Sequence, residues 1–192
     1  MPRPKSYDRD EAIAQACAAF WEHGYGPLGV RALEQKTGLN KFAIRSEFGG
    51  KEGLFLSAMT YYHTAARQTV LAPLATGGIQ EIIAFFEGLV TAGSVNSSAW
   101  GCLMVNTGVE NAEIKSDALT RAADAYWAEL RDGFEKALTH STCSDPAQTA
   151  QALVTAVIGI HTMNRIAGAH DAGRPLVTVM VAQLNTWRST DV

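Results

Sequence analysis

The stretch GLNKFAIRSEFGGKEGLF, Gly38–Phe55, decides the fold. Asn40 is a strong N-cap for a helix over residues 41–48, and the pair Gly49-Gly50 ends that helix. A further helix begins at Lys51. Upstream, residues 30–37 predict another short helix, which Gly38 closes. Two short helices joined by a tight glycine-containing turn predict a helix-turn-helix unit.

Helical periodicity continues on both sides of this unit. Asp8 caps a first helix whose apolar residues share one face, and Gly24 ends it. The fourth helix runs from Lys51 to about Leu71 and is predicted to end near Pro73. Further helices are predicted over residues 79–95, 116–138, 146–169 and 176–187, with a short or broken helix in residues 102–113. The sequence therefore predicts an all-α fold with a three-helix helix-turn-helix domain, residues 1–50, and a larger helical domain, residues 51–192.

The helix over residues 41–48 has one face suited to reading DNA. At about 100° per residue, the pattern directs Phe42, Arg45 and Ser46 outward and Ile44 and Phe48 inward. In a helix-turn-helix, the outward face of the second helix enters the major groove. Ala43 lies between the two faces. Lys41 and Glu47 lie on opposite flanks, and we expect Glu47 to pair with a nearby Lys or Arg rather than read cytosine.

Charge limits how such a unit binds. The whole chain has a net charge of −3, and residues 1–67 carry only a small excess of positive charge. A protein that binds nucleic acid through bulk electrostatics is far more basic. We therefore expect a small DNA-binding patch. The polar start of the chain shows no signal peptide, and no apolar run reaches about 18 residues, so we expect a cytoplasmic protein.

The segment AFWEHGYGPLGVRALEQKTGLNKFAIRSEFGGKEGLF, residues 19–55, resembles the TetR family of one-component transcriptional regulators. It shares the Gly24-Tyr25 end of the first helix and the Thr37-Gly38 pair. It also shares the spacing of Phe48, Lys51 and Leu54. The resemblance implies a homodimeric repressor that binds a pseudo-palindromic operator and is released by a small molecule, without a cofactor or metal.

The DNA-binding residues expected from the face and the resemblance together form one set. They are Arg3, Lys5, Arg31, Asn40, Lys41, Phe42, Ala43, Arg45, Ser46 and Lys51. The family usually has Tyr in place of Arg45, and Arg45 can either contact a phosphate or read guanine in a bidentate manner. Phe42 can pack on a thymine methyl group. The resemblance implies a phosphate contact for Lys51, while Arg3 and Lys5 are expected to form an N-terminal arm along the DNA.

The larger domain shows no catalytic constellation, which favours a binding domain over an enzyme. The resemblance implies a ligand pocket and a dimer formed by the last two long helices. The candidate ligand-binding residues are Met59, Tyr62, Phe86, Trp100, Cys102, Met104, Asn106, Tyr126, Trp127, His161 and Arg165. The candidate dimer residues are Leu153, Val154, Val157, Ile158, His161, Leu176, Met180, Leu184 and Trp187. His161 and Arg165 stand on an otherwise apolar helix, where they can orient an acidic ligand or bridge the dimer.

Two alternatives remain open at this stage. The segment WGCLMVNT, residues 100–107, resembles a branch of the family in which some members sense electrophiles or oxidants, so Cys102 is either a sensor or an inert packed thiol. We favour the packed thiol, because no charged residue lies near it in the sequence. The other alternative is a helical protein without sequence-specific DNA binding. It is either a regulator-like protein that binds a small molecule but has lost DNA binding, or a sequestering protein or thiol-dependent enzyme that uses Cys102 or His161.

Overall fold

The computed structural model describes residues 7–188, and all regular secondary structure in that range is helical. The all-α prediction is therefore confirmed. The elements are α1 (Arg9–His23), α2 (Val30–Thr37), α3 (Lys41–Phe48), α4 (Lys51–Ala66), η1 (Arg67–Leu71), α5 (Ala72–Thr76), α6 (Ile79–Gly88), α7 (Leu103–Ile114), α8 (Asp117–Leu138), α9 (Pro146–Ala167) and α10 (Arg174–Asn185).

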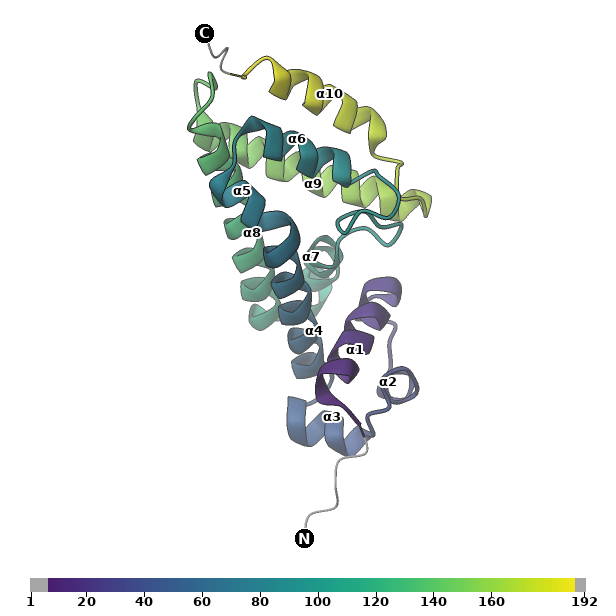
Figure 1. Ribbon diagram of the computed structural model, residues 1–192. Helices are drawn as coiled ribbons and strands as arrows, with labels where there is room; N and C mark the ends of the chain where they lie inside the picture. The colour runs from purple at the N-terminus through teal and green to yellow at the C-terminus, as the bar shows by residue number, and fades with distance from the viewer. Residues whose placement is uncertain (1–6, 189–192) are drawn as a thin grey trace.

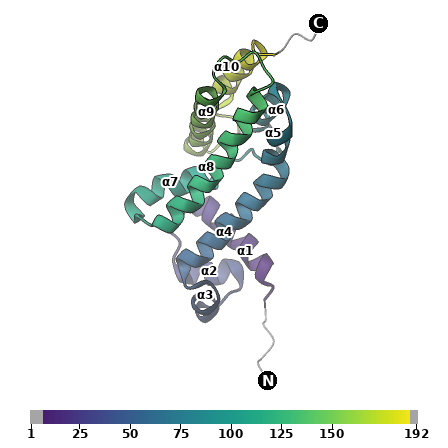
Figure 2. The same cartoon turned by 90° about the vertical axis from the view of Figure 1, so that its left-hand side faces the viewer.

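The helices form an elongated molecule with two ends (Figure 1). At one end, α1, α2 and α3 pack together against the first part of α4. From there α4 runs alongside α8 towards the other end, as Figure 2 also shows. At that end α6, α9 and α10 form a layer, in which α10 packs mainly on α6. The helix α4 thus belongs to both ends of the molecule.

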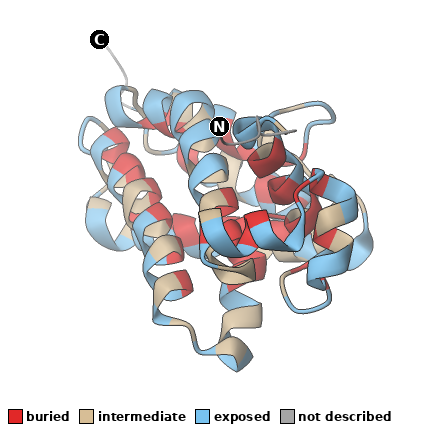
Figure 3. Ribbon diagram, turned by 90° about the horizontal axis from the view of Figure 1, so that it is seen from below, coloured by how far each residue is buried: buried red, intermediate tan, exposed pale blue. Residues whose placement is uncertain are grey.

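A continuous hydrophobic core joins the two ends. Figure 3 shows the buried residues on the inward sides of the helices and the exposed residues on their outer sides. In the N-terminal part, the rings of Phe20 and Phe55 lie 4.6 Å apart between their centroids. In the C-terminal part, Phe86 stacks on Phe134 with centroids 5.9 Å apart. All four rings belong to one cluster, so neither end packs independently of the other.

The predicted end of the fourth helix near Pro73 is wrong, because the chain stays helical to Thr76. Residues 67–71 form a wide turn in which the amide of Ala72 donates to the carbonyl of Arg67, five residues earlier. Proline normally breaks a helix because it lacks an N–H group and its ring meets the carbonyl four residues before it. The wide turn shifts the carbonyls that precede Pro73 in the chain. Pro73 then lies in the first turn of α5, a position where proline is tolerated.

The predicted helix over residues 79–95 is also too long, because α6 ends at Gly88. Beyond it the amides of Leu89 and Val90 donate to carbonyls three residues earlier, which tightens the chain into turns. The released carbonyls find distant partners. The Asn164 side chain donates to Leu89 O at 3.2 Å, and Arg174 donates to Val90 O at 2.6 Å. These long-range bonds end the helix where its apolar pattern continues.

Candidate functional site

The turn between α2 and α3 is fixed by local hydrogen bonds. Gly38 adopts a left-handed conformation with φ of 68° and donates its amide to Glu34 O. The Asn40 side chain accepts from the amides of Phe42 and Ala43 at 3.0 and 2.9 Å. The Glu34 carboxylate accepts from the amide of Lys41 at 2.7 Å. These bonds hold the start of α3 at a set angle to α2.

The two faces of α3 follow the predicted pattern. Ile44 and Phe48 are buried, whereas Arg45 and Ser46 are exposed and Phe42 has 72% of its surface exposed. Two of the expected DNA-binding residues have structural roles. Ala43 is buried because its methyl group faces the core, and Asn40 uses its side chain to cap α3.

A hollow of about 740 Å³ lies beside the outer face of α3. Lys41, Phe42, Arg45 and Lys51 contribute to its lining, so three cations and an exposed aromatic ring border one hollow. The Lys51 ammonium lies 4.3 Å above the ring centroid of Tyr25 and 3.4 Å from Gly26 O. Burial lowers the pKa of Lys51. Lys51 therefore borders the hollow while resting on Tyr25.

Two other residues of the helix-turn-helix, Arg31 and Glu47, do not line this hollow. Arg31 is exposed on α2. Glu47 accepts a hydrogen bond from the Tyr7 hydroxyl, which keeps its carboxylate on the side of α3, as the helical wheel predicts. That hydrogen bond raises the pKa of Tyr7. Arg3 and Lys5 lie outside the described residues.

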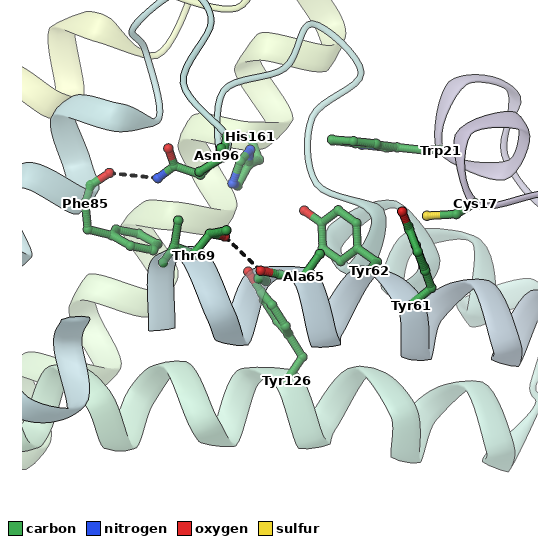
Figure 4. A pocket seen from close by; sticks show the side chains of 13 residues that line it. Cys17, Trp21, Tyr61, Tyr62, Ala65, Thr69, Phe85, Asn96, Tyr126 and His161 are labelled. Atoms are coloured by element: carbon green, nitrogen blue, oxygen red, sulfur yellow. Dashed lines mark hydrogen bonds between the residues drawn. The ribbon is translucent and has the colours of Figure 1, made fainter. Parts of the chain in front are cut away.

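A second feature is a cavity of about 240 Å³ between the two ends of the molecule (Figure 4). It lies among α1, α4, η1, α6, α8, α9 and the loop before α7. Its lining residues are Cys17, Trp21, Tyr61, Tyr62, Ala65, Ala66, Thr69, Val70, Phe85, Val95, Asn96, Tyr126 and His161. The predicted Tyr62, Tyr126 and His161 are among them.

The other predicted ligand residues lie elsewhere. Met59, Phe86, Cys102, Met104 and Asn106 are buried, but none of them is among the residues that line the cavity. The rest, which are only partly buried or exposed and also do not line it, are Trp100, Trp127 and Arg165.

The sequence does not predict Cys17 and Trp21 in the cavity, because both belong to α1 and that helix is expected in the DNA-binding part. The position of Trp21 near the end of α1 is the feature of the sequence that could have indicated its place in the cavity.

His161 is the least satisfied polar group of the cavity. Its side chain is only 4% exposed, and Nδ1 has no hydrogen-bond partner among the described residues. Burial lowers the pKa of His161 to about 4, so the imidazole is neutral at pH 7. Figure 4 shows the ring among the residues that line the cavity. A buried polar atom without a partner is costly to stability.

The thiols show no sign of activation. Cys102 is fully buried, and the Tyr62 hydroxyl donates to its sulfur at 3.4 Å. Burial raises the pKa of Cys102, and it raises the pKa of Cys17 to about 12. A reactive cysteine needs a lowered pKa and access to solvent. The burial of Cys102 agrees with an inert packed thiol.

Hydrogen bonds connect the end of α1 to the larger domain. The Trp21 indole donates to Gly101 O at 2.9 Å. Arg165 on α9 donates to Trp21 O at 3.0 Å. The Glu110 carboxylate on α7 accepts from the amide of Gly26 at 2.7 Å. Because Trp21 also lines the cavity, one residue joins the cavity, the loop before α7 and the helix-turn-helix end.

The candidate dimer surface differs from the predicted one. Leu153, Val154, Val157, His161 and Leu184 are buried within the subunit, because these faces of α9 and α10 pack on its own core. They are unavailable to a partner.

The exposed apolar residues lie on the opposite faces. Ile158 and Ile166 lie on α9, and Leu176 and Val179 lie on α10. Of the predicted set, Ile158 and Leu176 are exposed, and Met180 and Trp187 are half-buried.

Residues 7–188 contain neither a candidate metal site nor a candidate membrane span. No group of three or more His, Cys, Asp or Glu side chains is placed to hold a metal ion. No helix in that range is long and apolar enough to cross a membrane.

Residues 12–58 match the family described as bacterial regulatory proteins, tetR family. This match begins in α1 and ends inside α4, so it contains the whole helix-turn-helix.

Residues 12–58 thus form a DNA-binding region of the TetR type.

Two curated relatives are similar over part of their length. The HTH-type transcriptional repressor ComR of Escherichia coli (strain K12) is 30% identical over 107 residues, which cover 54% of this chain and 51% of that repressor. The alignment thus spans about half the length of ComR. The HTH-type transcriptional repressor AcnR of Corynebacterium glutamicum (strain ATCC 13032) is 47% identical over 49 residues, 26% of each chain. Both relatives are transcriptional regulators.

Solved structures share the fold along nearly the whole chain. A cysteine mutant of the TetR family transcriptional regulator CifR, complexed with 26-bp double-strand operator DNA, has a TM-score of 0.71 and 22% identity. The match covers 96% of this chain and 99% of that chain. Reduced NemR from E. coli has a TM-score of 0.75, 19% identity and coverage of 96% and 98%. The larger domain therefore has the TetR regulator fold as well.

Proposed function

We propose that the protein is a homodimeric transcriptional repressor that binds a pseudo-palindromic operator and responds to a small molecule. The observation that carries the proposal is Phe42, which exposes 72% of its surface on the outer face of a firmly capped helix. A large exposed aromatic residue among cations is typical of a surface that meets a partner. The regulator relatives and the operator complex of CifR support DNA as that partner.

Roles on the DNA follow from the placement of each side chain. Phe42, Arg45 and Ser46 share the exposed face of α3 and would meet base edges in the major groove. Lys41, Lys51 and Arg31 surround that face and would contact phosphates, which position the protein without reading sequence. The start of α4 has no side-chain cap, so its free amides favour a phosphate too. The arm formed by Arg3 and Lys5 stays a prediction from the sequence.

The proposed dimer uses the exposed faces of α9 and α10 rather than their buried faces. Val179 is 63% exposed and Ile158 is 36% exposed, although both are apolar. Pairing of two helices from each subunit across a two-fold axis would cover these residues in a four-helix interface. Such a dimer places two recognition helices on successive major grooves, about 34–36 Å apart.

The proposed ligand response operates through α1 and α4. Both helices line the cavity, and both belong to the DNA-binding end. A ligand that contacts Trp21 and Tyr62 favours the arrangement of α1 and α4 that suits it best, and this shifts the separation of the two recognition helices. Release of the operator follows when that arrangement no longer fits the groove spacing. We accordingly place residues 1–50 in DNA reading and residues 51–192 in ligand binding and dimerisation, in a cytoplasmic protein.

Selection of bound duplexes from a random-sequence library, followed by mobility-shift titration, tests this proposal. A repressor of this kind enriches a pseudo-palindromic site, and its affinity for that site falls steeply with salt. A sequestering protein or an enzyme would enrich no sequence. The electrophile-sensing alternative is disfavoured by the burial of Cys102, and no observation favours a thiol-dependent enzyme.

A further inference from the structure

The lining of the cavity carries no formal charge. Its residues are aromatic, aliphatic or neutral polar, and the described lining includes no Asp, Glu, Lys or Arg. The only titratable base is His161, which burial keeps neutral at pH 7. Transfer of an isolated ion into such surroundings costs far more than transfer of a neutral polar group. The cavity is therefore unsuited to a charged ligand.

The nearest ion pairs do not offer a counter-charge. Glu129 on α8 accepts two hydrogen bonds from Arg67, at 2.8 and 2.7 Å, and also contacts His63 at 2.8 Å. Arg165 donates to Trp21 O and Trp100 O and does not line the cavity. These groups already satisfy one another or the backbone. Arg165 is therefore not placed to orient an acidic ligand in this cavity.

The polar atoms of the lining are mostly used within the protein. The Asn96 amide nitrogen donates to Phe85 O at 3.0 Å, and its oxygen accepts from Ser94 at 2.7 Å. Thr69 donates to Ala65 O at 2.8 Å, and Tyr62 donates to Cys102. Neither ring nitrogen of His161 has a hydrogen-bond partner among residues 7–188, although the ring lines the cavity. A ligand with one hydrogen-bonding group would give this ring a partner.

The walls and the size define the rest of the ligand. Trp21, Tyr61, Tyr62, Phe85 and Tyr126 present aromatic surface to the cavity (Figure 4). Aromatic side chains favour stacked or edge-to-face contact with another aromatic ring. A dry cavity of about 150 Å³ accepts a benzene molecule. At about 240 Å³, this cavity has room for roughly two fused rings.

We infer that the cavity binds an uncharged aromatic molecule of about two fused rings, whose single polar group hydrogen-bonds to His161. The inference rests on the proposed function, because it names the class of effector for the same cavity. It adds a residue that sets specificity. The neutral imidazole offers one N–H donor and one acceptor nitrogen, so a hydroxyl group on the ligand can pair with the ring in either tautomer.

The test compares three probes of matched shape at pH 7: 2-naphthol, naphthalene and 2-naphthoate. Their binding to the full-length protein is measured without DNA by calorimetry or tryptophan quenching. We expect 2-naphthol to bind at least ten-fold more tightly than the other two. His161→Phe should lower the affinity for 2-naphthol to that for naphthalene, whereas His161→Gln should keep part of the preference. Thermal melts establish that both variants are folded.

Three results would overturn the inference. These are equal or tighter binding of 2-naphthoate, equal binding of naphthalene and 2-naphthol, and a preference for 2-naphthol that survives in His161→Phe. Binding of none of the probes would also overturn it, because the cavity would then not accept two-ring molecules. Operator binding of the protein alone is measured separately, so failure of the inference leaves the DNA-binding proposal to its own test.

Discussion

Arg165 and Trp21 join the two ends of the molecule by a direct hydrogen bond. The guanidinium of Arg165, on α9, donates to the backbone carbonyl of Trp21, in the last turn of α1, at 3.0 Å. The same nitrogen donates to Trp100 O at 2.9 Å. One side chain of the larger domain thus fixes the end of a helix that belongs to the DNA-binding end and lines the cavity.

We predict that Arg165→Met loosens the end of α1 without unfolding the protein. Hydrogen bonds from a charged donor contribute about 1.5–3 kcal/mol, so amide exchange near residues 20–26 should rise about ten-fold or more. Hydrogen-exchange mass spectrometry measures this change peptide by peptide. Arg121→Met, at an exposed position on α8, is the matched control and should leave the exchange unchanged. Unaltered exchange in Arg165→Met would show that the bond does not hold α1.

Gly101 is predicted to tolerate no side chain. Its φ is +73°, and an added Cβ would lie 2.8 Å from the carbonyl oxygen of His161. The carbonyl of Gly101 also accepts the indole hydrogen bond of Trp21. We expect Gly101→Ala to lower the free energy of unfolding by about 2 kcal/mol or more, measured by urea denaturation.

The control for that substitution is Gly108→Ala. Gly108 lies within α7, and an added Cβ there meets nothing within 4 Å. Alanine should raise the free energy of unfolding by up to about 1 kcal/mol at this position, because it favours the helix. Equal effects of the two substitutions would contradict the close packing of Gly101 on α9.

His161 predicts a specific dependence of stability on pH. Its pKa is about 4 in the folded protein, compared with 6.5 as the ordinary value. The unfolded chain therefore binds more protons between these values, and the free energy of unfolding falls as the pH is lowered from about 6.5 to 4. Protonation of His161 lowers the free energy of unfolding by about 3 kcal/mol across this pH window. Above pH 6.5 the contribution of His161 no longer changes.

The variant His161→Leu isolates this contribution. It should be more stable than the wild type by about 1 kcal/mol at pH 7.5, because it removes an unpaired buried nitrogen. The difference between the two proteins should grow as the pH falls towards 4, since carboxylates titrate alike in both. Urea melts at several pH values give the difference directly. A constant difference across the window would mean that the imidazole is not buried as described.

The proposed dimer predicts the effect of a charge on α10. Val179→Glu places a carboxylate on a 63% exposed apolar position, and its desolvation at an interface should shift the dimer towards monomer. Analytical ultracentrifugation measures the change. Ala125→Glu adds the same charge at an exposed position on α8 and should leave the dimer intact. A Val179→Glu protein that remains dimeric at micromolar concentration would place the interface elsewhere.

The sequence predicts the structure well where interactions between neighbours in the chain determine it. The bounds of α2 and α3 and the two faces of α3 follow from caps and helical periodicity, which involve neighbours in the chain. The TetR resemblance of residues 19–55 rests on the same segment. Ala43 lies between the two faces of α3 on the helical wheel. Packing, rather than its angle on the wheel, determines that it is buried.

Distant interactions explain what the sequence did not reveal. The helix α6 ends early because Asn164 and Arg174, from far along the chain, bind the carbonyls of Leu89 and Val90 just beyond its end. Trp21 enters the cavity because Arg165 and Gly101 hold the end of α1 there. Likewise, the apolar faces of α9 and α10 looked like an interface, but packing determines which face remains exposed. Spacing alone does not distinguish a core face from a dimer face.

The central claim is that the outer face of α3 reads DNA. Mobility-shift titration of wild type, Arg45→Ala and Arg121→Ala on a selected operator tests it most directly, with circular dichroism to establish folding. A base contact of the kind available to Arg45 is worth about 1–3 kcal/mol per subunit, so we predict at least a ten-fold loss for Arg45→Ala. We expect Arg121→Ala, on α8, to bind like the wild type. A folded Arg45→Ala protein with wild-type operator affinity would contradict the account.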